Sequence, residues 1–362
     1  TASNNYQDER APLAGVSIDA IDEFSVEYTG MKAEHGRAMG IINFVTRSGT
    51  NEYHGSAYEY LRNNAFDASG FFAARAPVMK QSNFGATFGG PVYLPKIYRG
   101  RDKTFFFASY EGFRSRAGSN PRFMTIPEPE MYNGDFRGWV TSAGARIRIY
   151  DPATTRPNPG GAGYIRDPFP DNLIPMSRFS QVAKNYIAIR PNQMVPNIPG
   201  SGSRTNYYRA EGGQTNPWNK YSVKIDHTLT ESDRISFLWL DNVWETKDLP
   251  EGPPGLPCPF CGINNWTRKN RSGRATWNRT FSPTILNSFR FSYNRDMGDV
   301  ITSTAVDPNA RWGERMGIKN DDPTLDRGLP PLTMTEYTGW SSAAFGFDRG
   351  RDLHIAEDLT VI

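Results

Sequence analysis

The sequence is poor in cysteine, histidine and long apolar runs. Its 362 residues include only 2 Cys and 4 His, and the histidines are widely separated, so the sequence shows no zinc site of ordinary spacing. It has no run of about 18 apolar residues, which excludes a transmembrane helix. A strand needs only about 10 alternating residues to cross a membrane, so a membrane β-barrel remains possible.

Charge of one sign is also lacking. The formal net charge is +3, with Lys and Arg dispersed among Asp and Glu, so there is no electrostatic footprint for nucleic acid. We find no Ser/His/Asp set, phosphate-binding loop or paired acids at catalytic spacing. The sequence therefore predicts no enzymatic activity, no cofactor and no metal site.

Aromatic residues, glycine and proline are plentiful. Aromatics make up 13% of the chain, which also has 34 Gly and 27 Pro. Aromatic side chains suit a pleated surface, and Gly and Pro mark turns. The composition therefore favours a mainly β protein made of many short strands.

Alternation of apolar and polar residues marks the strands. Residues 221–229 give the clearest case, with Tyr221, Val223 and Ile225 on one face and Ser222, Lys224 and Asp226 on the other. One apolar and one polar face is what a strand between lipid and a watery lumen requires. We predict eight such strands, at residues 52–61, 83–92, 104–113, 221–229, 235–244, 274–281 and 286–295 and from 353 onward.

The links between these strands alternate in length. Those after the first, third, fifth and seventh strands are long, and the others are short or modest. Outer-membrane barrels have short periplasmic turns and long external loops, so we expect the long links to face outward. The longest, residues 115–219, is rich in Pro, Gly, Asn and Arg, and an amphipathic piece at 177–189 predicts a short helix within it.

The first fifty residues have a different pattern from the alternating strands that follow. Residues 18–28 predict a turn and a strand, and residues 40–47 predict a more continuously apolar, buried strand, so we expect a small α+β element over 1–50. Residues 1–10 lack the basic start and apolar core of a signal peptide, and residues 352–362 stop within a strand-like alternation. We therefore expect the chain to be an internal fragment.

Several segments carry a family resemblance. IDEF at residues 21–24, EHGRA at 34–38, NFVTRSGTN at 43–51 and HGS at 54–56 resemble the junction between plug and barrel in TonB-dependent outer-membrane receptors. FGATFGGP at 84–91 and KTFFFASYEGFR at 103–114 are similar to the Oar-like subgroup, whose members often carry an upstream carboxypeptidase-regulatory-like domain. The resemblance is dense over residues 18–114 and looser beyond.

This resemblance implies a bacterial outer-membrane protein whose barrel of 22 strands is filled by a plug. Residues 1–50 would be the C-terminal part of the plug domain, and residues 51–362 the N-terminal part of the barrel, with about eight of its strands. The implied function is energy-coupled uptake of a large or scarce solute, such as an oligosaccharide, a peptide or an iron chelate. The implied partners are the TonB complex of the inner membrane, outer-membrane lipid and the extracellular solute.

Three sets of residues are candidates for function. Exposed loop aromatics can stack on sugar rings or cap an apolar ligand, and they can also pack within the loop, which is the role we slightly favour. Polar residues of the lumen and plug can pair with one another, or they can be hydrated without a specific partner. The loop aromatics are Trp139, Tyr164, Phe169, Tyr207 and Tyr208, and the lumen and plug residues are Glu34, Arg37, Glu111, Arg114, Lys224 and Asp226.

The third set is the pair Cys258 and Cys261. A C-x-x-C spacing occurs in thiol redox and metal motifs, but here it lies in a Pro- and Gly-rich loop with no second pair. A short-range disulfide in an oxidising envelope is the interpretation we favour.

A second hypothesis belongs to another class of protein: a secreted or surface β-sandwich that binds carbohydrate in adhesion. A sandwich needs its aromatic strand faces to meet, whereas a barrel leaves residues such as Phe106, Tyr110, Phe289 and Phe291 pointing away from the protein. The unequal link lengths favour the barrel. For this chain alone we expect an open, curved sheet with the 1–50 element on its polar, concave side.

Overall fold

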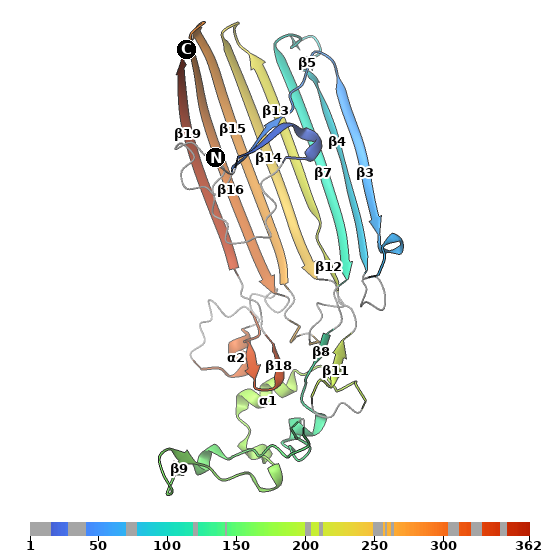
Figure 1. Cartoon of the computed structure of the whole chain (residues 1–362), viewed down its shortest axis with the longest axis vertical. Helices are drawn as coiled ribbons and strands as arrows, with labels where there is room; N and C mark the ends of the chain where they lie inside the picture. The colour runs from blue at the N-terminus through green and yellow to red at the C-terminus, as the bar shows by residue number, and fades with distance from the viewer. Residues whose placement is uncertain are drawn as a thin grey trace.

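A computed structural model describes most of the chain, and one long antiparallel sheet dominates it (Figure 1). The residues that the structure describes are 16–27, 41–69, 78–118, 122–141, 143–199, 204–209, 213–248, 256–257, 259–261, 264–302, 311–319, 328–340 and 346–362.

The sheet has nine strands, and each of the eight predicted strands is present in it. Its order is β19-β16-β15-β14-β12-β7-β4-β3, with β13 pairing with both β14 and β7, so β12 and β13 share one position. Most strands are longer than the alternation predicted. The strands are β3 (His54–Asn63), β4 (Met79–Pro91), β7 (Thr104–Gly118), β12 (Gly213–Thr215), β13 (Trp218–Thr228), β14 (Asp233–Asp248), β15 (Asn264–Ser282), β16 (Ile285–Thr302) and β19 (Gly346–Val361).

A continuous register sorts the side chains of the sheet into two faces. One row across five strand pairs joins Phe106, Ile225, Phe237, Ala275, Phe291 and Ile355. We call this apolar face the outer face. The opposite, inner face carries Ser109 and Ser222, whose hydroxyl oxygens lie 2.6 Å apart, and the buried Glu111. The polarity is that predicted for a wall between lipid and a lumen.

The N-terminal element lies on the inner face. It consists of η1 (Ile18–Ala20) and a separate two-stranded sheet of β1 (Ile21–Glu27) and β2 (Ile41–Thr46), close to the predicted turn and strands. Val16 and Ala20 form a small buried cluster with Phe107 and Leu240 of the wall. Two apolar residues of the inner face are therefore covered by this element and not by water.

The outer face carries no second sheet among the described residues. Ile225, Phe237 and Phe291 remain 37 to 43% exposed, whereas a sandwich would bury such side chains between two sheets. The sheet is also open, because β3 and β19 each pair with one neighbour among the described strands. No described helix has the length and apolar character to cross a membrane.

The long links gather at one end of the sheet and the short ones at the other (Figure 1). Residues 283–284 alone separate β15 from β16, and β5 (Tyr93–Leu94) and β6 (Tyr98–Arg99) form a small hairpin between β4 and β7. The longest link holds α1 (Gln181–Ala188), inside the predicted range 177–189, and the Ser180 hydroxyl accepts the Ala183 N–H as its N-cap. The alternation of link lengths thus places the long segments at a single end.

The long links contain short elements in place of extended coil. Besides α1 and the 3-10 turn η3 (Asn64–Phe66) at the end of β3, they are β8 (Arg122–Met124), η4 (Pro129–Asn133), η5 (Pro152–Thr154), β9 (Arg156–Pro157), β10 (Tyr164–Ile165), η6 (Pro170–Asn172), η7 (Met176–Arg178), β11 (Tyr207–Arg209), α2 (Trp312–Met316), β17 (Leu332–Met334) and β18 (Tyr337–Trp340).

Candidate functional site

Three long links fold together into one unit, which we call the loop module: the described residues of 122–209, 256–261 and 311–340. Its hydrophobic core combines side chains from all three links, so no link could bury these residues alone. Core residues of the first link are Met124, Ile126, Tyr186, Met194 and Tyr207; Leu256 and Phe260 come from the second, and Met316 and Leu329 from the third.

Two buried asparagines fix the backbone of the loop module. Asn206, 0% exposed, accepts the Ile126 N–H at 2.9 Å and donates to the Ile126 carbonyl oxygen at 2.9 Å. Asn172 accepts the Ile149 N–H and donates to the carbonyl oxygens of Phe136 and Ile147. A primary amide can replace the hydrogen bonds of a missing strand in this way. No sequence pattern marks these two asparagines as buried, because asparagine in a loop usually indicates a turn.

Two of the five predicted loop aromatics pack inside the module. Tyr207 is a core residue, 5% exposed. The ring of Trp139, which is half-buried, lies 6.1 Å from the ring of Phe136 and 6.1 Å from that of Tyr337. Both side chains thus make packing contacts within the loops, which is one of the two roles considered above.

The other three loop aromatics reach the surface at separate places. Tyr164 is 76% exposed, and Phe169 is partly covered by Arg178, whose guanidinium carbon lies 5.7 Å from the ring centre. Tyr208 is 37% exposed and lies 5.2 Å from the ring of Phe123, on paired strands β8 and β11. The five residues do not form one site. Tyr208 is the one that shares an exposed aromatic surface with a further residue, Phe123.

Lys224 on the inner face binds the N-terminal element. Its ammonium donates to the Thr46 carbonyl oxygen and to the Ser48 hydroxyl, both at 2.9 Å, and lies 3.9 Å from the carboxylate of Asp226. The predicted lumenal role of Lys224 thus takes the form of a bridge to backbone and hydroxyl groups near residue 47. The predicted partners Glu34 and Arg37 lie outside the described residues.

Glu111 is the most deeply buried acid of the inner face, at 3% exposed. It accepts a hydrogen bond from the Asn83 amide at 3.1 Å, and the Lys220 ammonium lies 4.0 Å away. Its partners are therefore other residues of the wall.

Arg114 departs from the prediction, because it lies on the outer face. Residues 111 and 114 differ by an odd number, so in an unbroken strand they point to opposite faces. The Arg114 guanidinium lies over the Phe84 ring at 5.5 Å and donates to the Trp218 carbonyl oxygen and the Asn219 side chain. It is not a contact of the lumen.

Cys261 is buried and disulfide-bonded. The other cysteine of the chain, Cys258, lies outside the described residues. Among the described residues, no group of three or more His, Cys, Asp or Glu side chains is placed to hold a metal ion.

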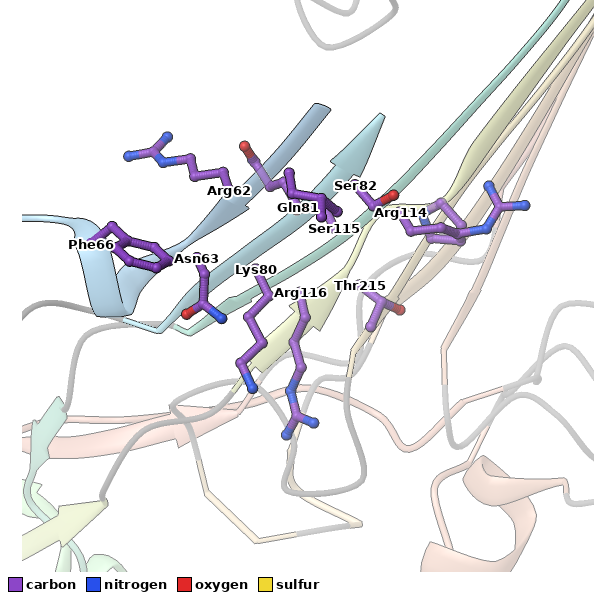
Figure 2. Close-up of a pocket in the computed structure, with 12 residues that line it drawn as sticks. Arg62, Asn63, Phe66, Lys80, Gln81, Ser82, Arg114, Ser115, Arg116 and Thr215 are labelled. Carbon is purple, nitrogen blue, oxygen red and sulfur yellow. The ribbon is translucent and has the colours of Figure 1, made fainter. Parts of the chain in front are cut away.

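A groove of about 650 Å³ lies at the loop end of β3, β4 and β7 (Figure 2). Leu61 and Phe66 give it an apolar wall, and Lys80 and Arg116 lie side by side and point the same way. No predicted strand reaches this groove, because Phe66, Lys80 and Arg116 lie beyond the predicted strand ends at residues 61, 83 and 113. Its remaining lining includes Arg62, Gln81, Arg114 and Thr215.

The comparison with known protein families agrees with this geometry. The family described as outer membrane beta barrel domain matches residues 45–362, which include every strand of the large sheet. The chain belongs to this family. It is therefore a protein of the bacterial outer membrane, and the large sheet is part of its barrel wall.

A curated relative points in the same direction. The chain is 32% identical over 104 residues to the TonB-dependent transporter Oar of Myxococcus xanthus. That match covers 26% of this chain and 9% of the relative's length. No solved structure matches the chain significantly.

Two tyrosines inside the loop module have strongly shifted pKa values. Burial raises the pKa of Tyr132 to about 12 against the opposing effect of Arg190, which lies over its ring at 4.3 Å. Burial also raises the pKa of Tyr337 to about 12, reinforced by the carboxylates of Glu128 and Glu336. Both hydroxyls are therefore held neutral in the folded module.

We expect the loop module to lose stability between about pH 10 and pH 12. Unfolded tyrosine ionises near pH 10, so in this window the unfolded chain binds fewer protons and rising pH favours unfolding. Protease cleavage of the loop module in isolated outer membranes, measured at about pH 9 and pH 11, will show a steeper increase for the wild type than for Tyr132→Phe/Tyr337→Phe. An equal increase in both would show that these tyrosines do not control it.

Proposed function

We propose that this chain is part of a TonB-dependent receptor that takes up a large or scarce solute, and that it is not an enzyme. The observation that carries the proposal is the N-terminal element held on the inner face of the wall by Lys224 and by the cluster around Phe107. A plug that fills a barrel must make such contacts with the lining of the barrel. The partial similarity to a TonB-dependent transporter supports the same function.

The loop module would capture the solute. In outer-membrane barrels the long loops face the exterior and the short turns face the periplasm, which puts the loop module outside the cell. Its three links share one core, so the module presents a defined surface to a ligand. On that surface the exposed rings of Phe123 and Tyr208 suit the faces of sugar rings, so among oligosaccharide, peptide and iron chelate we favour the oligosaccharide.

Uptake by cells tests the proposal. Cells that lack the gene are complemented with the full-length protein, and accumulation of labelled oligosaccharides is measured with and without a working TonB complex. Phe123→Ala/Tyr208→Ala is expected to reduce uptake at low solute concentration about tenfold, since two ring contacts of about 0.7 kcal/mol each amount to one power of ten. Uptake that persists without TonB contradicts the proposal, and surface binding without uptake favours adhesion.

A matched control removes two exposed apolar side chains at the opposite end of the sheet. Tyr93 and Ile97 are 53% and 83% exposed in and beside the β5–β6 hairpin. The variant Tyr93→Ala/Ile97→Ala is expected to leave uptake unchanged, which separates a ligand contact from a general loss of exposed apolar side chains.

A further inference from the structure

The outer face of the wall changes from apolar to cationic between two adjacent rows. One row joins Val223, Trp239, Gly273, Tyr293 and Leu353. The next row toward the loop module joins Tyr221, Asp241, Arg271, Arg295 and Arg351. Aromatic side chains are typical of the membrane interface, so this boundary marks the edge of the lipid-facing band.

The height of the apolar band agrees with a membrane boundary at the arginine row. Along β15 the next outer-face arginine on the side of the short turns is Arg279, which is eight residues from Arg271. Eight residues of antiparallel strand span about 26 Å before tilt, close to the apolar band of about 25 Å in outer-membrane barrels. The arginine row therefore lies at the level of the lipid headgroups on the loop side.

Cations lie directly opposite one another at two places of the outer face. In the arginine row, Arg295 pairs with both Arg271 and Arg351. The row continues through Tyr221 and Tyr110 to Ala86 on β4, and six residues from Ala86 toward the loop module Lys80 pairs with Arg116 at the groove. Like charges in directly opposite positions destabilise a sheet. An anion bound between them would remove the repulsion.

Among the described residues, carboxylates of the same face neutralise one of these cations, Arg271, and form no ion pair with the others. Asp241 pairs with Arg271 at 3.3 Å, whereas Glu245 and Asp299 pair with Lys247 and Arg349. Glu59, beside the groove, accepts a hydrogen bond from Ser82. Among the described residues no carboxylate forms an ion pair with Lys80, Arg116, Arg295 or Arg351, and we call these four residues the cationic belt.

We propose that the cationic belt binds the phosphate groups of lipids in the outer leaflet. Guanidinium groups match phosphate oxygens in a bidentate geometry, and the belt borders an apolar surface that acyl chains cover. The groove offers contacts to both parts of such a lipid (Figure 2). Leu61 and Phe66 can contact an acyl chain, and Lys80 and Arg116 beside them can bind the phosphate. The proposal depends on the outer-membrane location of the chain and not on solute transport.

Lipid binding to the purified full-length protein tests this assignment. The protein is held in a neutral detergent, and native mass spectrometry compares phosphatidic acid with phosphatidylcholine as added lipids. The belt variant Lys80→Gln/Arg116→Gln/Arg295→Gln/Arg351→Gln is expected to bind phosphatidic acid at least tenfold more weakly than wild type. Its affinity for phosphatidylcholine is expected to stay the same.

The control removes the same charge from exposed positions of the loop module, as Arg146→Gln/Arg148→Gln/Arg166→Gln/Lys184→Gln, and is expected to bind like wild type. An equal loss of affinity for phosphatidic acid in the control would show that net charge alone causes the effect, and this would overturn the proposal. Wild-type affinity in the belt variant would overturn it as well. Competition by inorganic phosphate alone, with no preference for the lipid, would also overturn it.

A second measurement uses only the wild-type protein, so its result does not depend on whether a variant folds correctly. Photoactivatable phosphatidic acid is crosslinked to the wild-type protein in native outer membranes, and the sites are mapped by mass spectrometry. The expected crosslinks lie within a few residues of 80, 116, 295 and 351. Crosslinks confined to other segments would contradict the assignment.

Discussion

Replacement of Ile126 by alanine is expected to open the loop module while the barrel wall stays intact. Ile126 is 0% exposed and lies in the core that three links share. A buried Ile to Ala change costs about 2–5 kcal/mol through lost burial and the cavity left behind. No described strand of the loop module belongs to the large sheet, so we expect the shared core to supply much of the stability of the module.

Proteolysis of isolated outer membranes measures this effect. Ile126→Ala should be cleaved within residues 122–209 at protease concentrations that leave the wild type intact, and heat-modifiable migration of the barrel should be unchanged. Ile97→Ala is the matched control, because Ile97 is 83% exposed and such a surface change costs less than about 0.5 kcal/mol. Equal resistance of Ile126→Ala and wild type would show that the three links do not depend on a common core.

The same core explains why the sequence predicted the wall so much better than the loops. A wall strand can be predicted from its own residues, because alternation over ten residues determines which side chains share a face. The core of the loop module instead joins residues such as Met124 and Leu329, which are more than two hundred positions apart and follow no period. No local pattern marks Tyr207 as buried and its neighbour Tyr208 as exposed until β8 and β11 pair.

The prediction for Arg114 was wrong for a different reason. It grouped Arg114 with Glu111 by charge, although strand parity separates them onto opposite faces. Parity applied throughout would also have placed Lys80, Arg116, Arg295 and Arg351 on the outer face, but only with the strand ends and register that the structure supplies. Alternation thus fixes faces within a strand, and register is needed to bring side chains of different strands together.

The second large effect is expected at Gly49, where the chain passes from the N-terminal element to the wall. A Cβ at this position would overlap the carbonyl oxygen of Phe106 and lie 2.8 Å from that of Gly90. Both are backbone atoms of hydrogen-bonded wall strands, so neither can move without disturbing the sheet. Two residues later, Asn51 fixes the path by donating to Asp102 and accepting its N–H at 2.8 Å.

Gly49→Ala is therefore expected to destabilise the docked N-terminal element by about 1–3 kcal/mol, the usual cost of overpacking a close contact. Hydrogen exchange of residues 41–50 in the full-length protein, reconstituted in neutral lipid, should accelerate at least tenfold, because 1.4 kcal/mol is one power of ten in the opening equilibrium. Gly138→Ala is the matched control, since a Cβ there meets nothing within 4 Å. If Gly49→Ala exchanges as slowly as wild type and Gly138→Ala, the close approach of residue 49 to the wall does not hold the element in place.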